Sequence, residues 1–369
     1  MGRPLPVDLV RAGDTAWDAW LSDVPRDIYH TAGYHAYAEA SGDGDSYLGV
    51  VGDRRRGLAW PYLLRRVDDV AGPPAADAVD VNSVYGYPGP LAWGCLPGDP
   101  FVARAWSEVV RIWREQGAVS AFTRFHPLLD NASLVSGLPW PPERTAGSGP
   151  VTAIGPTVSI DCTMEDDVAR ANYARALRQH VAAGRRAGLE TFHDEGWVHL
   201  PIFTRLYGET MARSGADDYY FFDQADFERL RIALSGHVHL LVTRLGDQVG
   251  AAGLFTEFDG IVEAHLVGTD YALRALSPFK VLLDDARTWA RVRGDSVLHI
   301  GGGRRGREDS LFRFKSEFSQ RRHVFHVGRW ILHPEAYRDL LHARAARVVD
   351  DDPLDEAYFP AYRAPTISR

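Results

Sequence analysis

The segment from Leu298 to Phe318 reads LHIGGGRRGREDSLFRFKSEF. It begins as a short apolar run, continues as a loop rich in glycine and arginine, and ends with aromatic residues at helical spacing. We therefore predict a buried strand, a loop and a helix. Consecutive glycines allow close backbone approach, and arginines beside a helix N-terminus can form an anion site. A tight turn with solvated arginines explains the same residues, so both interpretations stay open.

Composition indicates an ordinary globular protein. The chain has 369 residues, 45% of them hydrophobic and 24% charged, which suffices for two domains of usual size or one large one. A net charge of −8 argues against a DNA-coating surface but allows a local basic groove. No apolar run is long enough to span a membrane, and the N-terminus lacks a secretion signal. With only Cys95 and Cys162, we expect a cytoplasmic protein without disulfides or a cysteine zinc site.

Lysine is rare in this chain. Of 41 basic side chains, only Lys280 and Lys315 are lysines. Where lysine persists against such an arginine bias, a compact ammonium with an adjustable pKa can be needed. Chance is the alternative explanation for each lysine taken alone.

Two halves of the chain repeat one order of predicted elements: a β-hairpin, a further strand, a helix and a strand. The first half spans residues 47–125, and prolines in VNSVYGYPGPLAW (81–93) favour a bulged or edge strand. The second half spans residues 237–300, where Asp259-Gly260 is typical of a hairpin turn. Residues 130–157 resemble a linker or long surface loop. We predict an α/β (α+β) fold with two copies of one architecture, mixed sheets and packed helices.

A basic helix is predicted between the halves. Thr163 and Asp166 have capping-box spacing, and the helical pattern runs to about Arg186. Four arginines fall on one arc of this helix, as a phosphate-binding stripe for a nucleic acid would need, although a solvated basic face is the usual explanation. They are Arg175, Arg178, Arg185 and Arg186.

The order of elements resembles a GNAT-type acyltransferase core, and two such cores around a basic helix resemble the FemABX family. That family transfers an amino acid from aminoacyl-tRNA to an amine of a cell-wall precursor. The resemblance implies subdomains at 1–156 and 157–335, with the donor site in the second, and a tail at 336–369. It covers about residues 30–335 and rests on YGYPGPL (85–91), ARANYARALRQHVAAGRRAGL (169–189), YGETMARSGADDYYFF (207–222) and HIGGGRRGREDSLFRFKSEFS (299–319).

The resemblance implies a donor site around the opening segment. Phe314 would stack on the terminal adenine of the tRNA, and Lys315 would stabilise charge on the ester carbonyl. The tRNA phosphates would meet the arginine stripe and the loop residues Gly301, Gly302, Gly303, Arg304, Arg305 and Arg307.

The acceptor side is implied less completely. Arg213, Tyr219, Tyr85 and Tyr87 are the expected acceptor contacts. His265 lies on a strand whose bulge faces the reacting amine in GNAT folds, so it is a candidate proton acceptor with a pKa near working pH. A buried core histidine is the more common fate of such a residue. Glu263 and Asp270 are further candidates.

Departures from the family leave alternatives open. His126-Pro127 stands where cell-wall members typically have Asp-Pro, so the acceptor could be a small-molecule or antibiotic amine instead of a peptidoglycan precursor. An acyl-CoA-dependent GNAT enzyme is the first alternative, although RALSPFK (274–280) lacks the glycines of a CoA loop. A non-catalytic protein that binds tRNA or the precursor is the second. We expect no cofactor and no metal, since the pair His237 and His239 is weak evidence for one.

Overall fold

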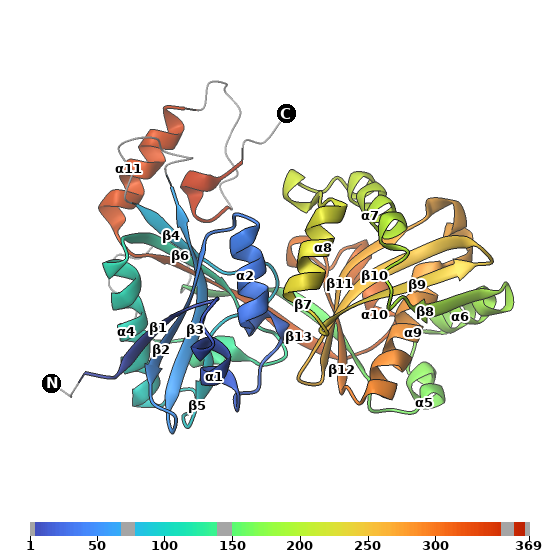
Figure 1. Cartoon of the computed structure of the whole chain (residues 1–369), viewed down its shortest axis with the longest axis horizontal. Helices are drawn as coiled ribbons and strands as arrows, with labels where there is room; N and C mark the ends of the chain where they lie inside the picture. The colour runs from blue at the N-terminus through green and yellow to red at the C-terminus, as the bar shows by residue number, and fades with distance from the viewer. Residues whose placement is uncertain (1–3, 68–77, 139–149, 348–357, 366–369) are drawn as a thin grey trace. The chain divides into compact units, whose positions relative to one another are not determined.

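The computed structural model describes residues 4–67, 78–138, 150–347 and 358–365 (Figure 1). It divides the chain into two compact units. Unit 1 comprises residues 1–154 and 325–369, and unit 2 comprises residues 155–324. None of the described helices is long and apolar enough to cross a membrane.

Unit 1 contains a mixed sheet. Its neighbouring strands are antiparallel except for β4 and β6, which run parallel, and the short strand β5 (Leu91–Trp93) pairs with β3. The order across the sheet is β1 (Val7–Arg11), β2 (Asp45–Gly52), β3 (Gly57–Arg66), β4 (Val79–Asn82), β6 (Ala118–Arg124) and β13 (Arg322–Ile331).

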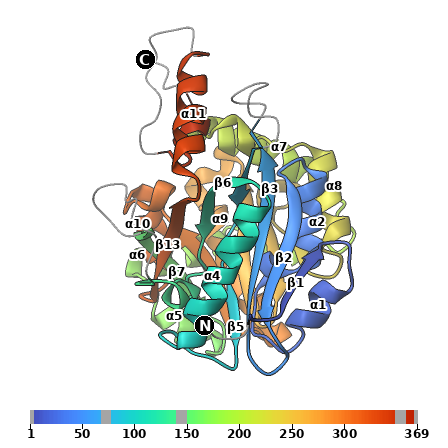
Figure 2. The same cartoon turned by 90° about the vertical axis from the view of Figure 1, so that its left-hand side faces the viewer.

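Helix α4 (Pro100–Glu115) packs against β2, β3 and β6 (Figure 2). Its Trp106 and Trp113 meet Trp60 of β3 and Trp330 of β13, with ring centroids 5.0–6.3 Å apart. This tryptophan cluster forms the centre of the core, because large aromatic rings bury much apolar area. Among the described residues, the other helices of the unit are α1 (Ala16–Leu21), η1 (Ile28–His30), α2 (Ala32–Ala40), η3 (Asn131–Leu134), α11 (Pro334–Ala345) and η7 (Ala361–Arg363).

Unit 2 also has mixed strand pairing, in which only β11 and β12 are parallel neighbours among the described strands. Its order is β7 (Val151–Asp161), β12 (Val297–Gly302), β11 (Ile261–Thr269), β10 (Gln248–Phe258), β9 (Val238–Leu245) and β8 (Leu189–His193). The turn between β10 and β11 has positive φ at Asp259 and Gly260, as its sequence predicts.

Helices cover this sheet. Leucines and alanines of α9 (Pro278–Arg293) share one apolar core with α6 (Arg175–Arg186) and α10 (Ser310–Ser316). Helix α7 (Leu200–Ser214) packs on β10 and β11 and contacts α8 (Gln224–Ala233) (Figure 1). The shorter helices are α5 (Asp166–Ala171), η4 (Asp218–Tyr220), η5 (Tyr271–Leu276) and η6 (Arg304–Gly306).

Both units confirm the predicted order of a hairpin, a strand, a helix and a strand: β2, β3, β4, α4, β6 in unit 1 and β9, β10, β11, α9, β12 in unit 2. The predicted bulged or edge strand at 81–93 is two strands, and β4 lies inside the sheet between β3 and β6. The prolines fall in the connection between β4 and β5, so they do not disturb the ladder.

Three other expectations were wrong in detail. Residues 130–157 are not simply a surface loop, because Ala132, Leu134 and Val135 are buried in the core and β7 begins at Val151; residues 139–149 lie outside the described part. Thr163 does not cap a long helix, because its hydroxyl donates to Asp161 and two helices, α5 and α6, replace it. Residues 325–335, expected in the second subdomain, group with unit 1, because β13 pairs with β6.

Candidate active site

The parallel strands β11 and β12 of unit 2 separate along their length. They pair only at Ile261 with Val297, Val262 with Leu298 and Glu263 with His299. Beyond these residues β11 follows β10, and β12 follows β7. The carboxyl halves of the two strands therefore splay apart from the Glu263–His299 level, and we call this opening the strand split.

Backbone irregularities produce the strand split. The register of β11 against β10 jumps from Leu266 to Ala264, so His265 is an extra residue in a β-bulge. The register of β12 against β7 skips Ile300, and Gly301 has φ of 70°. A bulge bends its strand and increases the local twist, so two bulges just past the last pair turn the strands away from each other.

A buried acid–base pair closes the narrow end of the strand split. The Nδ1 atom of His299 lies 2.9 Å and 2.8 Å from the two carboxylate oxygens of Glu263. His299 is fully buried, and Glu263 is 3% exposed. A carboxylate at this depth needs a hydrogen-bonding partner, which the His299 N–H supplies. Sequence reasoning missed His299; its signal was the parallel register with Glu263, which composition does not show.

Lys315 lies near the same pair. Its ammonium donates to the carbonyl oxygen of Gly302, 2.8 Å away, at the last residue of β12. Burial lowers the pKa of Lys315 to about 8, while the carboxylates of Asp309 and Glu263 act in the opposite direction. A cation is thus placed on a carbonyl oxygen at the open end of the strand split.

His265 sits at the expected bulge, but its expected pKa is wrong. Burial lowers the pKa of His265 to about 4, because the charged imidazolium loses its hydration. The ring is therefore neutral at working pH and is a weaker base than an ordinary imidazole. Asp270, the other candidate, accepts from Ala272 N–H and from Gln248, so it organises the turn into η5.

The glycines before α10 have a structural explanation. A Cβ on Gly302 would lie 2.7 Å from the carbonyl oxygen of Pro156, and one on Gly303 would lie 1.9 Å from that of Arg307. The N-terminus of α10 is occupied by Asp309, which accepts from the backbone N–H of Arg304 and Phe312. For the glycines the tight-turn interpretation holds, whereas the side chains of Arg304, Arg305 and Arg307 are exposed.

The Phe314 ring packs against two other phenylalanine rings. Its ring stacks on Phe279 of α9, with centroids 5.2 Å apart and planes at 14°, and it meets Phe318 edge-on. One face of the Phe314 ring is therefore covered by Phe279.

The arginine stripe is only partly available. Arg185 donates to the buried carboxylate of Asp284 at 2.6 Å, which gives it a structural role. Arg178 donates to the carbonyl oxygen of Ala171, whereas Arg175 and Arg186 are exposed.

The expected acceptor residues belong to different units. Arg213 donates to the carbonyl oxygen of Thr269 at the end of β11, and Tyr219 is 49% exposed in η4, both in unit 2. Tyr85 and Tyr87 lie in unit 1, where the Tyr87 ring contacts His126.

Unit 1 holds its own buried histidine–carboxylate pair. His126 Nε2 lies 2.9 Å from the Asp27 carboxylate, and both side chains are fully buried. The Nδ1 atom of His126 accepts from the backbone N–H of Leu128 and Leu129. Nε2 therefore donates to Asp27, and both ring nitrogens of His126 have partners within unit 1. Sequence reasoning noted His126 but missed Asp27.

His237 and His239 each have partners of their own, and both contact Glu257. His237 Nδ1 lies 3.0 Å from the Glu257 carbonyl oxygen, whereas His239 Nδ1 lies 3.3 Å from His193 Nε2.

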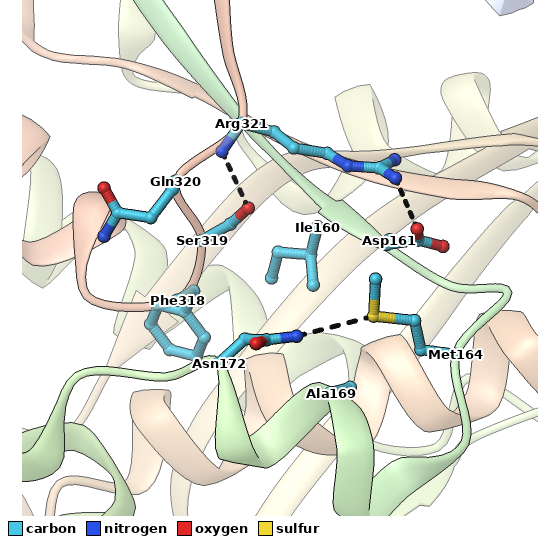
Figure 3. Close-up of a pocket in the computed structure, with 9 residues that line it drawn as sticks. All are labelled: Ile160, Asp161, Met164, Ala169, Asn172, Phe318, Ser319, Gln320 and Arg321. Carbon is cyan, nitrogen blue, oxygen red and sulfur yellow. Dashed lines mark hydrogen bonds and ion pairs between the residues drawn. The ribbon is translucent and has the colours of Figure 1, made fainter.

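A separate cavity of about 340 Å³ lies in unit 2 (Figure 3). The ion pair of Asp161 and Arg321 lines one side, and Phe318 and Asn172 line another. Asp161 pairs with Val297 at the start of β12, so the cavity is at the opposite end of β12 from the strand split.

Comparisons with known proteins address the fold. No protein-family model matches the chain, and neither does any curated protein. The crystal structure of FemX matches with a TM-score of 0.65 and 13% identity, over 90% of this chain and 99% of that chain. A conserved protein of unknown function from Bacteroides thetaiotaomicron matches with a TM-score of 0.55 and 11% identity, over 88% and 99%.

The C-terminal domain (DUF2156) of a putative lysylphosphatidylglycerol synthetase from Agrobacterium fabrum matches with a TM-score of 0.52 and 14% identity, over 89% and 95%. Identities this low bear on the fold alone. The chain has the fold of FemX, with two GNAT-like units in tandem.

Proposed function

We propose that this protein is an acyltransferase that moves an aminoacyl group from aminoacyl-tRNA to an amine and forms an amide bond. The observation that carries the proposal is the Lys315 ammonium on the Gly302 carbonyl at the open end of the strand split. The FemX fold supports it, because FemX shares both units and not one alone.

The proposed reaction is the aminolysis of an ester. The amine nitrogen of the acceptor attacks the ester carbonyl carbon of the donor, and a C–N bond forms while negative charge develops on the carbonyl oxygen. Lys315, which already binds a carbonyl oxygen, would stabilise that oxyanion. The ester C–O bond then breaks, and the ribose oxygen of the tRNA leaves as a hydroxyl after it takes up the proton that the attacking amine has lost.

The attacking amine must lose one proton. In the proposal Glu263 accepts it, and His299 orients the Glu263 carboxylate through its Nδ1–H. His265 is the weaker candidate, because burial lowers its pKa to about 4.

The remaining donor and acceptor contacts are proposals of the same kind. The exposed side chains of Arg304, Arg305 and Arg307 would meet phosphates near the tRNA 3′ end. Arg213 is the proposed contact for an anionic group of the acceptor, which would be a peptidoglycan precursor or a smaller amine.

An acyl-CoA donor is less well supported. A pyrophosphate at the start of α9 would need free backbone N–H groups, but Pro278 has none there. Ser277, with φ of 54°, occupies a left-handed position that a glycine would adopt without strain.

The test pairs each aminoacyl-tRNA with cell-wall precursors and small polyamines, and mass spectrometry detects the amide. Acetyl-CoA is included as a competing donor. Lys315→Met is compared with Arg111→Met, which removes an exposed cation from α4 in unit 1.

We expect transfer with the wild-type protein and with Arg111→Met, and about a 10²–10³-fold slower transfer with Lys315→Met. Consumption of aminoacyl-tRNA no faster than its spontaneous hydrolysis, across the whole panel, would reject the proposal. Acetylation from acetyl-CoA alone would favour the CoA-dependent alternative.

A further inference from the structure

Helix α10, which carries Phe314 and Lys315, has only seven residues. Such a short helix has little stability of its own, so its position depends on contacts at both ends. At its N-terminus Asp309 accepts from the Phe312 N–H. At its C-terminus the carbonyl oxygen of Glu317 accepts from the N–H of Ala174, 2.8 Å away, at the start of α6.

Lys280 in the first turn of α9 holds the same C-terminus through side chains. Its ammonium lies 2.6 Å from the Glu317 carboxylate and 3.2 Å from Nδ1 of His180 on α6. It also lies 5.7 Å from the centre of the Phe314 ring. The Lys280 side chain is 13% exposed, so this ion pair is screened less by water than a surface pair is.

Phe279, the residue before Lys280, makes a second contact with α10, because its ring stacks on Phe314. Two consecutive residues of α9 thus contact positions 314 and 317 of the segment that carries Lys315. Any shift of α10 along its axis would disturb both contacts at once.

These contacts explain why position 280 holds one of only two lysines among 41 basic residues. The partners of Lys280 lie in three directions: a carboxylate, an imidazole nitrogen and a ring face. A compact ammonium with three rotatable donors satisfies such a set, whereas the planar fork of arginine directs its donors into one plane. One lysine of the chain, Lys315, therefore lies in α10, and the other, Lys280, contacts its C-terminal end.

We propose that Lys280 is a positioning residue that fixes α10 so that Lys315 reaches the Gly302 carbonyl. The relevance of this role to catalysis rests on the proposed function, whereas the role itself is defined by the fold. Loss of Lys280 leaves the Glu317 carboxylate without its cation and loosens the C-terminal end of α10. Lys315 then moves toward solvent, and its ammonium loses a fixed carbonyl partner.

The scarcity of lysine makes a direct measurement simple. Incorporation of ε-¹³C-lysine labels two side chains, and Lys280→Met leaves Lys315 as the single labelled one. An NMR titration then reports the Lys315 pKa without any substrate. We expect the Lys315 pKa to rise from about 8 toward the ordinary 10.5 in Lys280→Met, because the ammonium regains hydration. An unchanged Lys315 titration in that variant would overturn the proposal.

Further variants separate positioning from general damage to the fold. Glu317→Gln should shift the Lys315 titration in the same direction as Lys280→Met. The double charge reversal Lys280→Glu with Glu317→Lys should restore part of the wild-type Lys315 titration. Its second lysine signal, from position 317, is assigned with the help of Glu317→Lys alone. Arg111→Met should leave the Lys315 titration unchanged. A melting curve on each variant shows whether the protein is folded. If Lys280→Met does not fold, Lys280→Arg replaces it in these measurements.

Kinetics give the second readout. We expect transfer by Lys280→Met to slow about 10–100-fold, as displacement of a catalytic group by about 1 Å does. Transfer at the wild-type rate would overturn the proposal even if the fold is softened. If wild-type protein transfers nothing but the Lys315 titration responds to Lys280, the positioning role stands and the proposed function fails.

Discussion

Each unit of this protein buries a histidine against a carboxylate, but the two pairs are built differently. In unit 1 each polar side-chain atom of the pair has a hydrogen bond. His126 Nε2 and one Asp27 oxygen bond each other, His126 Nδ1 accepts from two backbone N–H groups, and the other Asp27 oxygen accepts from Ile28 N–H. In unit 2 His299 donates to both oxygens of Glu263 at the narrow end of the strand split, and the Glu263 carboxylate acts on Lys315.

The difference shows that two histidine–carboxylate pairs of similar composition can have different roles. A pair whose remaining polar atoms are all hydrogen-bonded to the backbone holds a loop in place and is poorly suited to exchange protons. A pair at the end of an opening, electrostatically linked to a lysine, can respond to a ligand. Burial and pairing alone do not identify a site; the engagement of each atom does.

The largest expected effect is on stability in unit 1. Asp27→Ala should lower the free energy of unfolding by about 3–5 kcal/mol, because it leaves buried donors of His126 and Ile28 without an acceptor. Urea denaturation measures the change, with exposed Asp45→Ala as the control. A loss below about 1 kcal/mol would mean that the unit 1 pair is not structural.

The unit 2 pair should affect activity instead. Glu263→Gln keeps an oxygen that accepts from His299, so its stability should change little. Transfer should slow at least about 100-fold, because a proton acceptor is lost. Kinetics on the folded variant test this, and wild-type turnover would remove Glu263 from the mechanism.

The pH dependence of Lys315 sharpens the contrast. Its folded pKa of about 8 lies below the ordinary 10.5, so the unfolded chain binds more protons between these values. The free energy of unfolding should therefore increase as the pH rises from about 8 toward 10.5, and Lys315 should contribute no such gain below pH 8.

Activity has the opposite trend, since the ammonium is the active form and transfer should decline above pH 8. Glu263→Gln should lower the Lys315 pKa, because the Glu263 carboxylate raises it, whereas Asp45→Asn, which removes an exposed carboxylate, should leave the Lys315 pKa unchanged. Lysine NMR measures both variants, and equal shifts in the two would contradict the comparison.

The smallest effects should come from matched glutamine substitutions of the two histidines. His126→Gln can still donate to Asp27 but no longer accepts from Leu128 and Leu129, so it should lose about 1–3 kcal/mol of stability and little activity. His299→Gln should slow transfer about 10-fold by loosening Glu263. Equal losses of activity in both variants would remove the distinction.

Much of the fold was predictable from local patterns. The strands and helices of both halves follow from hydrophobic periodicity and turn residues, as in the hairpin at Asp259-Gly260. The helix that carries Phe314 and Lys315 was also predictable. The buried segment after Asp130 and the break between α5 and α6 were not, because loop burial and helix breaks depend on distant partners.

The sequence by itself determined the order of elements, the loop before α10 and the scarcity of lysine that singles out Lys280 and Lys315. Only the tertiary structure decided that His299 pairs with Glu263, that Arg185 neutralises a buried aspartate and that β13 joins unit 1. The reason is physical. Periodicity and turn chemistry act between residues close in sequence, whereas the desolvation and pairing of charges depend on residues that only the fold brings together.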